Sequence, residues 1–162
     1  MITGWRPPTA LEILSDATPQ ERELLGVFRY MPMDATLHTD LSVFPRTAVP
    51  HSGFSMTVSC TNQDVHFSGF NIDASVIQRI ATPKPLICSY NGTDKVAPEH
   101  FLAQSSYEHP VFNSEVFAVQ PRLPSLNTDR LAFAGSYFGS GYHEDGCASG
   151  VAAAAALGAT WE

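Results

Sequence analysis

The residues whose types and spacing could do chemistry gather near the end of the chain, between residues 135 and 150. Gly135 and Ser136 follow a short apolar segment, and His143-Glu144-Asp145-Gly146-Cys147 follows further glycines. Glycine lets a loop approach a ligand closely, and the first amides of a helix have no partner within that helix. The pattern predicts a strand over 131–134, a loop, and a helix opened by Asp145, whose start holds a negatively charged or electron-rich ligand edge.

Two strings in this stretch carry a family resemblance, Ala134-Gly-Ser-Tyr-Phe-Gly139 and Gly141-Tyr-His-Glu-Asp-Gly146, the second followed by Ser149-Gly150. Shorter matching strings lie upstream: Phe28-Arg-Tyr30, Leu37-His-Thr-Asp40, Pro45-Arg46, Tyr107-Glu-His-Pro-Val-Phe112 and Gln120-Pro-Arg-Leu-Pro-Ser-Leu126. With these strings the chain resembles bacterial NAD/FAD-binding, flavin-dependent oxidoreductases of the flavin-containing amine-oxidase superfamily. The resemblance covers nearly all of this chain and only the C-terminal portion of the family.

The resemblance implies an FAD site at the predicted loop and helix start. In it, Gly135 and Ser136 lie near the ribityl-phosphate part, and the amides near Gly146 and Cys147 face the pyrimidine edge of the flavin. Ser136 brings no charge where many superfamily members carry an acidic residue, which weakens the analogy with true amine oxidases. The implied cofactor-binding residues are Gly135, Ser136, His143, Glu144, Asp145, Gly146 and Cys147. No residue is identified as a catalytic base.

The pyrophosphate-binding motif G-x-G-x-x-G of that family is not found in this sequence. The nearest string is Gly139-Ser-Gly141, which has Glu144 where the third glycine belongs. The implied fold is therefore α/β with an α+β substrate-domain part: an incomplete FAD-binding fold of the glutathione-reductase-like or amine-oxidase-like kind. It has a mixed sheet and lacks the N-terminal Rossmann βαβ unit, so that the chain begins within a domain.

The resemblance divides the chain into three parts that must position this site. Residues 1–16 are expected to form an internal strand and helix of the FAD domain, and 17–118 a substrate-domain-like antiparallel sheet with short helices. Residues 119–162 return to the FAD domain with its last strand, the flavin loop and the C-terminal helix. Gly150 inside that helix predicts a neighbour packed where a methyl group would clash.

Local signals predict the individual elements. Thr18-Pro-Gln-Glu21 is a capping box that starts a helix ended by Gly26, and Asn113 caps a helix that runs to about Val119. β-branched and aromatic residues predict strands, with Pro32 at a bulge or an edge and a weak helix over 73–81. The predicted strands are 27–31, 34–39, 53–60, 64–70, 85–90 and 101–107.

Composition limits the classes of partner. The net charge of −7 and the absence of a run of Lys or Arg argue against nucleic acid and anionic membranes. No signal peptide or transmembrane segment is recognised, and three cysteines without C-x-x-C spacing fit a reducing compartment, so a cytoplasmic location is expected. The six histidines lack metal-ligand spacing, and no metal site is predicted.

The expected function is that of the C-terminal part of an FAD-dependent oxidoreductase, which would oxidise or desaturate a small or lipid-like substrate and would be inactive alone. Two alternatives stay open. In the first, the chain is one subunit of a split flavoenzyme, and a separate chain carries the G-x-G-x-x-G domain; this predicts a sticky apolar surface at an unpaired strand 1–5 and along the last helix. In the second, the chain is a non-enzymatic remnant or binding module that lacks FAD.

Overall fold

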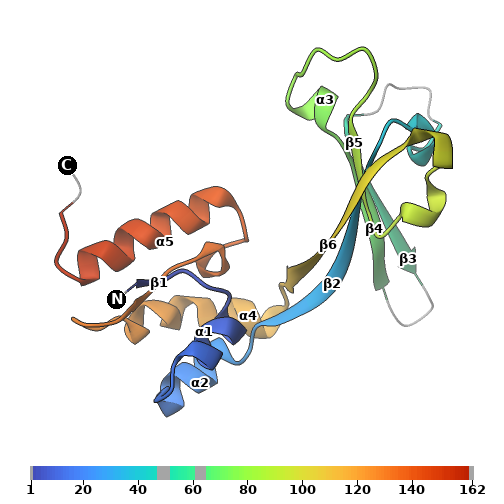
Figure 1. Cartoon of the computed structure of the whole chain (residues 1–162). Helices are drawn as coiled ribbons and strands as arrows, with labels where there is room; N and C mark the ends of the chain where they lie inside the picture. The colour runs from blue at the N-terminus through green and yellow to red at the C-terminus, as the bar shows by residue number, and fades with distance from the viewer. Residues whose placement is uncertain (1, 47–51, 61–64, 161–162) are drawn as a thin grey trace. The chain divides into compact units, whose positions relative to one another are not determined.

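The computed structural model describes residues 2–46, 52–60 and 65–160 and shows a mixed α/β protein (Figure 1). The chain divides into two compact units. The first unit combines Met1–Met31 with Pro110–Glu162, and the second is Pro32–His109. The predicted mixture of helices and strands is confirmed, and the strands form two separate sheets.

The first unit is built around a two-stranded parallel sheet. Strand β1 (Ile2–Thr3) pairs with β7 (Ala132–Phe133), with Ile2 opposite Ala132 and Thr3 opposite Phe133. The predicted strand at 1–5 is thus paired, where an unpaired strand was expected. Its other elements are α1 (Pro7–Ile13), α2 (Pro19–Leu25), α4 (Ser114–Val119), the 3-10 helix η4 (Gln120–Leu126) and α5 (His143–Ala156).

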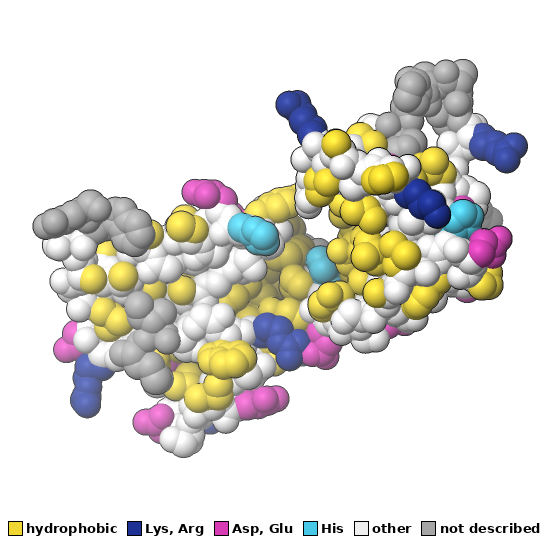
Figure 2. All heavy atoms as spheres, turned by 45° about the horizontal axis from the view of Figure 1, so that its top comes forward, with side chains coloured by type: hydrophobic (Ala, Val, Ile, Leu, Met, Phe, Trp, Pro, Cys, Tyr) yellow, Lys and Arg dark blue, Asp and Glu magenta, His cyan; other side chains and the backbone are white. Residues whose placement is uncertain are grey.

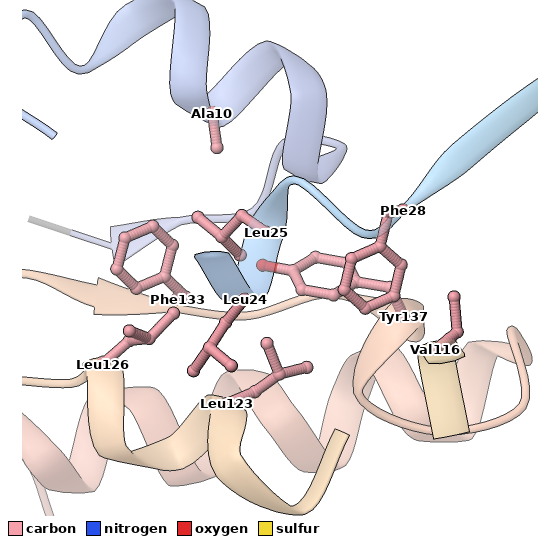
Figure 3. Packing of buried hydrophobic residues seen from close by; sticks show 9 residues of the cluster. All are labelled: Ala10, Leu24, Leu25, Phe28, Val116, Leu123, Leu126, Phe133 and Tyr137. Atoms are coloured by element: carbon pink, nitrogen blue, oxygen red, sulfur yellow. The ribbon is translucent and has the colours of Figure 1, made fainter. Parts of the chain in front are cut away.

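The two faces of β7 bury different cores, because successive side chains of a strand point to opposite faces. Phe133 packs in a cluster with residues of α1, α2, α4 and η4 (Figure 3). Its members are Ala10, Leu24, Leu25, Phe28, Val116, Leu123, Leu126, Phe133 and Tyr137. Ala132 and Ala134 point the other way and pack against Ala153 of α5. The β1–β7 sheet is therefore a thin central layer, and α5 lies on one side of it.

Two helix starts form as predicted. At α2 the Thr18 amide donates to Glu21 Oε2 at 2.6 Å, and the Glu21 amide donates back to Thr18 Oγ1 at 3.2 Å. At α4 the Val116 amide donates to Asn113 Oδ1 at 2.9 Å. Both capping contacts join residues three apart, and the capping motifs in the sequence are therefore sufficient to predict them.

The second unit is a five-stranded antiparallel sheet in the order β3-β4-β5-β2-β6. Its strands are β2 (Arg29–His38), β3 (Phe54–Cys60), β4 (Val65–Asp73), β5 (Ile87–Tyr90) and β6 (Phe101–Val111). The predictions of strands at 27–31 and 34–39 were wrong in one respect, since β2 is a single continuous strand. Its pairing with β5 covers Ala35–His38 and leaves Pro32 outside that ladder.

The helix predicted over 73–81 is only the single turn α3 (Ala74–Ile77). Asp73 caps it as expected, because its Oδ1 accepts from the amides of Ser75 and Val76 at 3.0 and 3.3 Å. The helix ends early since Arg79 has a positive φ of 54°, which lies outside the right-handed helical region.

The sheet of the second unit is apolar on one face and polar on the other. Register places Leu37, Cys88, Ile72 and Phe54 on one face, with Ala35, Tyr90, Phe70 and Met56 beside them. Thr36, Ser89, Asn71 and Ser55 lie on the opposite face, with His38, Ile87 and Asp73 beside them. The buried residues of this polar face include His38 and Ser89, both fully inaccessible, whereas Phe54 and Met56 of the apolar face are exposed. Figure 2 shows hydrophobic side chains, in yellow, gathered on the surface of this unit. The core of this unit therefore combines a hydrogen-bonded polar layer with buried apolar side chains such as Met33, Phe44 and Ile87.

Candidate functional site

The predicted loop between β7 and α5 is shaped by glycines. Gly135 has φ +151°, and a Cβ there would meet the Tyr137 ring at 2.4 Å, so only glycine fits. A 3-10 turn, η5 (Ser136–Phe138), follows directly. Gly141 has φ +95°, which turns the chain into α5. Glycine at 135 is thus required by the chain's own packing, and the predicted close approach to a ligand stays a prediction.

Side chains from two other elements fix the path of this loop. Gln120 Nε2 donates to the carbonyl oxygens of Tyr137 at 3.0 Å and Gly139 at 2.5 Å. Asp145 Oδ2 accepts from the amides of Ser140 at 3.0 Å and Tyr142 at 2.9 Å. A Cβ at Gly139 would collide with the Asp145 carboxyl group. Glycine at 139 is therefore required for Asp145 to reach the loop.

The helix begins two residues earlier than predicted, at His143, with Tyr142 as the preceding residue. Asp145 was expected to open the helix, but it is the third residue of the first turn and bonds backward to the loop. His143, Glu144 and Asp145 consequently lie in a helical turn and not in an extended loop. Cys147 lies beyond the first three residues of α5, and its side chain is exposed.

The backbone at the start of α5 offers donors that nothing in the described chain occupies. The amides of His143 and Glu144 have no partner within the helix and none elsewhere in the described residues. The amide of Ser136 lies beside this turn, because a Cβ built on Gly146 would be 3.6 Å from Ser136 N. We call the Ser136, His143 and Glu144 amides the α5 amide site. Such unpaired amides at a helix start attract an electron-rich group.

Ser149 is the residue that ties α5 to the end of β7, and sequence analysis did not single it out. Its Oγ accepts from the Gly135 amide at 2.9 Å and lies 2.9 Å from the Gly146 carbonyl oxygen and 3.1 Å from that of Gly135. The side chain is buried and faces the β1–β7 sheet together with Ala153. The Gly135 amide is thereby occupied and is not a donor for a ligand.

The structure brings the seven predicted cofactor-binding residues together at one place, but they differ in what they can still contact. The amide of Gly135 and the carboxylate of Asp145 are committed to the protein itself. The amide of Gly146 donates to the Tyr142 carbonyl oxygen at 3.2 Å. Ser136, His143, Glu144 and Cys147 keep atoms available to a ligand. The set therefore offers backbone amides, and the side chains of Ser136, His143, Glu144 and Cys147, to a ligand.

The expected close packing at Gly150 is wrong for the described residues, since nothing there lies within 4 Å of a Cβ built on it. The buried side of α5 instead carries Ser149 and Ala153, with Leu157 partly buried. These residues recur every four positions and form one face of the helix. Gly150 lies beside that face, so a methyl group there would meet no atom of the described chain.

A serine–histidine pair in the second unit resembles a nucleophile with its general base. In this pair, however, the histidine donates to the serine, whereas a base must accept from it. His38 Nε2 lies 2.7 Å from Ser89 Oγ, and the Asp40 amide donates to His38 Nδ1 at 3.1 Å. The ring proton must then be on Nε2, which donates to Ser89 Oγ, and Ser89 in turn donates to Asn71 Oδ1 at 2.5 Å. A neutral histidine that donates cannot accept the serine proton, and burial lowers the pKa of His38. The pair is structural.

Further observations bear on function. In the described residues no group of three or more His, Cys, Asp or Glu side chains could hold a metal ion. No described helix has the length and apolar character needed to cross a membrane. A pocket of about 60 Å³ beside the polar face, lined in part by Thr57, Tyr90 and Lys95, is far smaller than pockets for organic ligands, which are on the order of 300–1,000 Å³.

Comparison with protein-family models and with curated proteins gives no match for this chain.

Proposed function

We propose that this chain is the C-terminal part of an FAD-dependent oxidoreductase, and that the α5 amide site binds the flavin end of the cofactor. The parallel pairing of β1 with β7 is the observation that carries the proposal. Parallel strands place their carboxyl ends at the same edge, and open α/β sheets bind ligands beyond that edge. Gly4 follows β1 there, and Gly135 follows β7, with the first turn of α5 beside Gly135.

The chemistry of the donors suits a flavin. A bound flavin supplies the redox chemistry itself by taking up a hydride from the substrate, and its pyrimidine edge becomes more negative when it is reduced. The amides of His143 and Glu144 lie at the positive end of the 14-residue helix α5 and would donate to that edge. Ser136 can add a hydroxyl group. Gly135 and Gly146 keep the backbone free of side chains, which would otherwise cover these amides.

The apolar face of the second unit supports the proposed substrate class. Phe54 and Phe70 lie 5.9 Å apart between ring centroids, and Phe70 stacks on Tyr90 at 4.2 Å. Met56 is 55% exposed on the same face. Exposed aromatic and aliphatic side chains of this kind favour a substrate with hydrocarbon character over a strongly charged one.

Amide NMR with riboflavin tests the proposal, because riboflavin has the flavin ring and the ribityl chain but needs no pyrophosphate site. We expect riboflavin to shift the amide signals of Ser136, His143 and Glu144. Two glycines of α5 provide matched variants. Gly146→Ala places a methyl group beside the Ser136 amide and should abolish the shifts, whereas Gly150→Ala adds a methyl group in open space and should keep them.

The outcomes separate clearly. Shifts that are lost in Gly146→Ala and kept in Gly150→Ala support flavin binding at the α5 amide site. Shifts confined to the second unit, or the same response in both variants, would contradict it. Tight flavin binding by the purified chain, surviving desalting as yellow protein, would contradict the view that the FAD site is incomplete.

A split flavoenzyme is a second candidate, and exposed aromatic side chains after β1 and before α5 favour it. Trp5 follows β1 and is 62% exposed, and Tyr142 precedes α5 and is 72% exposed. Large exposed aromatic side chains are typical of a surface covered by a partner. Co-expression with chains that carry G-x-G-x-x-G tests this: a stable complex with flavin near equal stoichiometry would select the split enzyme, and Trp5→Ser should weaken it.

A further inference from the structure

Strand β6 (Phe101–Val111) is a long edge strand with little protection. Its neighbour in the described sheet is β2, on one side. Every residue from Phe101 to His109 is exposed, including the large apolar side chains of Phe101, Leu102 and Tyr107. An edge strand presents backbone donors and acceptors to which another strand can pair, and natural edges are usually blocked by charges, prolines or bulges. The segment Phe101–Tyr107 has no charged residue and no proline.

The strand at this edge can be paired with a reversed copy of itself. The segment Phe101–Tyr107 begins and ends with an aromatic residue, with Gln104 at the centre. In an antiparallel pair of two identical strands centred on Gln104, each residue stands opposite the one equally far from Gln104 on the other side. Phe101 of each strand then meets Tyr107 of the other.

The geometry of antiparallel pairing restricts the possible centres. Alternate residues of an edge strand direct their backbone groups outward, and a ladder forms only when such residues meet on both strands. The two-fold axis that relates two paired copies of one strand must therefore pass through a residue and not between two residues. Centring on Ala103 or Ser105 does not oppose Phe101 to Tyr107. Gln104 is the centre that pairs these two aromatic residues.

We propose that a second copy of this chain pairs its β6 strand with β6 in antiparallel orientation, with a two-fold axis at Gln104. Phe101 of each copy lies opposite Tyr107 of the other, and aromatic cross-strand pairs stabilise sheets. The ladder ends beyond these pairs, because the 3-10 helix η3 (Pro98–His100) directly precedes β6 and because Pro110 has no amide to donate. Two-fold symmetry is the commonest arrangement for homodimers.

Disulfide trapping tests the register in the full chain with Cys147→Ser as background, because Cys147 is exposed. Gln104→Cys stands opposite itself, at a separation that a disulfide can span, and should cross-link to twice the 17.6 kDa mass of the single chain on oxidation. Ala103→Cys and Ser105→Cys should not cross-link alone, but should cross-link when mixed, because residue 103 faces residue 105. Peptide mapping identifies each cross-link. Cross-linking of either variant alone to the extent of Gln104→Cys would overturn the register.

Sedimentation of the chain without cysteine substitutions tests the dimer itself. We expect a mass of twice 17.6 kDa at micromolar concentration. Gln104→Lys places two positive charges opposite each other and should weaken dimerisation at least tenfold, whereas Gln78→Lys adds the same charge at an exposed site outside β6 and should not. Circular dichroism checks that both variants fold. A monomer at all concentrations, or a dimer equally stable in both variants, would overturn the proposal. Flavin is absent from both measurements, so failure here leaves the proposed function untouched.

Discussion

Single side chains decide much of the local structure, and Asp40 shows this most clearly. Its two carboxylate oxygens accept from the amides of Ser42 at 2.9 Å and Ala97 at 3.0 Å, which joins the end of β2 to the segment after β5. The hydrogen bond from the Ala97 amide, followed by those from Ser42, lowers the pKa of Asp40 to about 2. The ionised form is thus the one that the fold stabilises.

The linkage between this carboxyl group and folding has a definite sign. Because the pKa of Asp40 is 3.8 when unperturbed and about 2 when folded, its contribution is complete above pH 3.8 and is lost as the pH falls toward 2. Asp40→Asn should lower the free energy of unfolding by about 1–3 kcal/mol at neutral pH. Its side-chain NH2 group then faces one of the two backbone amides, and two donors cannot hydrogen-bond to each other. The difference between wild type and variant, measured by urea unfolding, should shrink between pH 4 and 2. Asp129→Asn, at an exposed position, should show no such difference, and a difference independent of pH would contradict the assignment.

Tyr137 carries a hydroxyl group that has no hydrogen-bond partner in the described structure, although the residue is 4% exposed. Figure 3 shows this hydroxyl among the side chains of the cluster that contains Leu25 and Phe133. Burial raises the pKa of Tyr137 above its ordinary value. The ring itself packs well, with its centroid 5.3 Å from that of Phe28 in an edge-to-face contact.

Removing this hydroxyl should stabilise the protein. Tyr137→Phe keeps the ring contact with Phe28 and removes a buried polar atom without a partner, so the free energy of unfolding should rise by about 1 kcal/mol. Tyr142→Phe makes the same chemical change on a side chain that is 72% exposed, and should change stability little. Urea unfolding of both variants checks this. A loss of stability in Tyr137→Phe alone would mean that the hydroxyl is bonded, for example to a buried water.

At the scale of elements, α5 depends on the loop before it more than on its own sequence. Alanine-rich segments have high helix propensity, but the start of α5 is set by bonds from Asp145 to Ser140 and Tyr142, and its position on the sheet by Ser149. Gly135 and Gly150 differ in how strictly the structure requires glycine at each position. The first has a backbone conformation that other residues rarely adopt, whereas the second is an ordinary helical residue in open space.

Alanine substitutions at these two glycines should therefore have opposite effects. Gly135→Ala places a Cβ 2.4 Å from the Tyr137 ring at φ +151°, and should lower the free energy of unfolding by about 1–3 kcal/mol. Gly150→Ala should raise it by about 0.5–1 kcal/mol because alanine favours the helical state. Thermal or urea unfolding gives both values. Equal and small effects would show that the strain at Gly135 is relieved by a shift of the loop.

At the scale of the whole molecule, the two units are stabilised by different kinds of core. The first unit buries aliphatic and aromatic side chains, among them Leu24 and Phe133, both fully inaccessible. The second unit buries Ile87 beside a hydrogen-bonded layer in which His38, Ser89 and Asn71 are linked. The hydrogen bonds of His38 in this layer require its neutral ring, and since burial lowers the pKa of His38, this layer loses stability as the pH falls below 6.5.

Truncation in each core tests whether the units unfold separately. Leu24→Ala in the first unit and Ile87→Ala in the second each remove a fully buried aliphatic side chain, and should cost about 2–5 kcal/mol. Amide hydrogen exchange should become faster mainly in the unit that carries the substitution. Acceleration of the same size throughout the chain in both variants would show that the two units unfold as one.

The sequence by itself determined the elements whose contacts are local. The Thr18–Glu21 capping box and the Asn113 cap join residues three apart, and they formed as predicted together with most of the strands. The glycine-rich loop and the helix after Gly135 could be predicted for the same reason. The first residue of α5 was missed because Asp145 can either cap a helix or bond backward from its first turn, and the residue types do not distinguish these two arrangements.

Only the tertiary structure decided the contacts between distant residues. Ser149 and Gly135 are 14 residues apart, and His38 and Ser89 are 51 apart. Alternation along β2 shows that its two faces differ, but which face is buried depends on the segments at Leu41–Val43 and Thr93–Lys95 that cover it. The pairing of β1 with β7 likewise joins residues near opposite ends of the chain. Such contacts depend on how the whole chain closes on itself, because no single segment contains both partners.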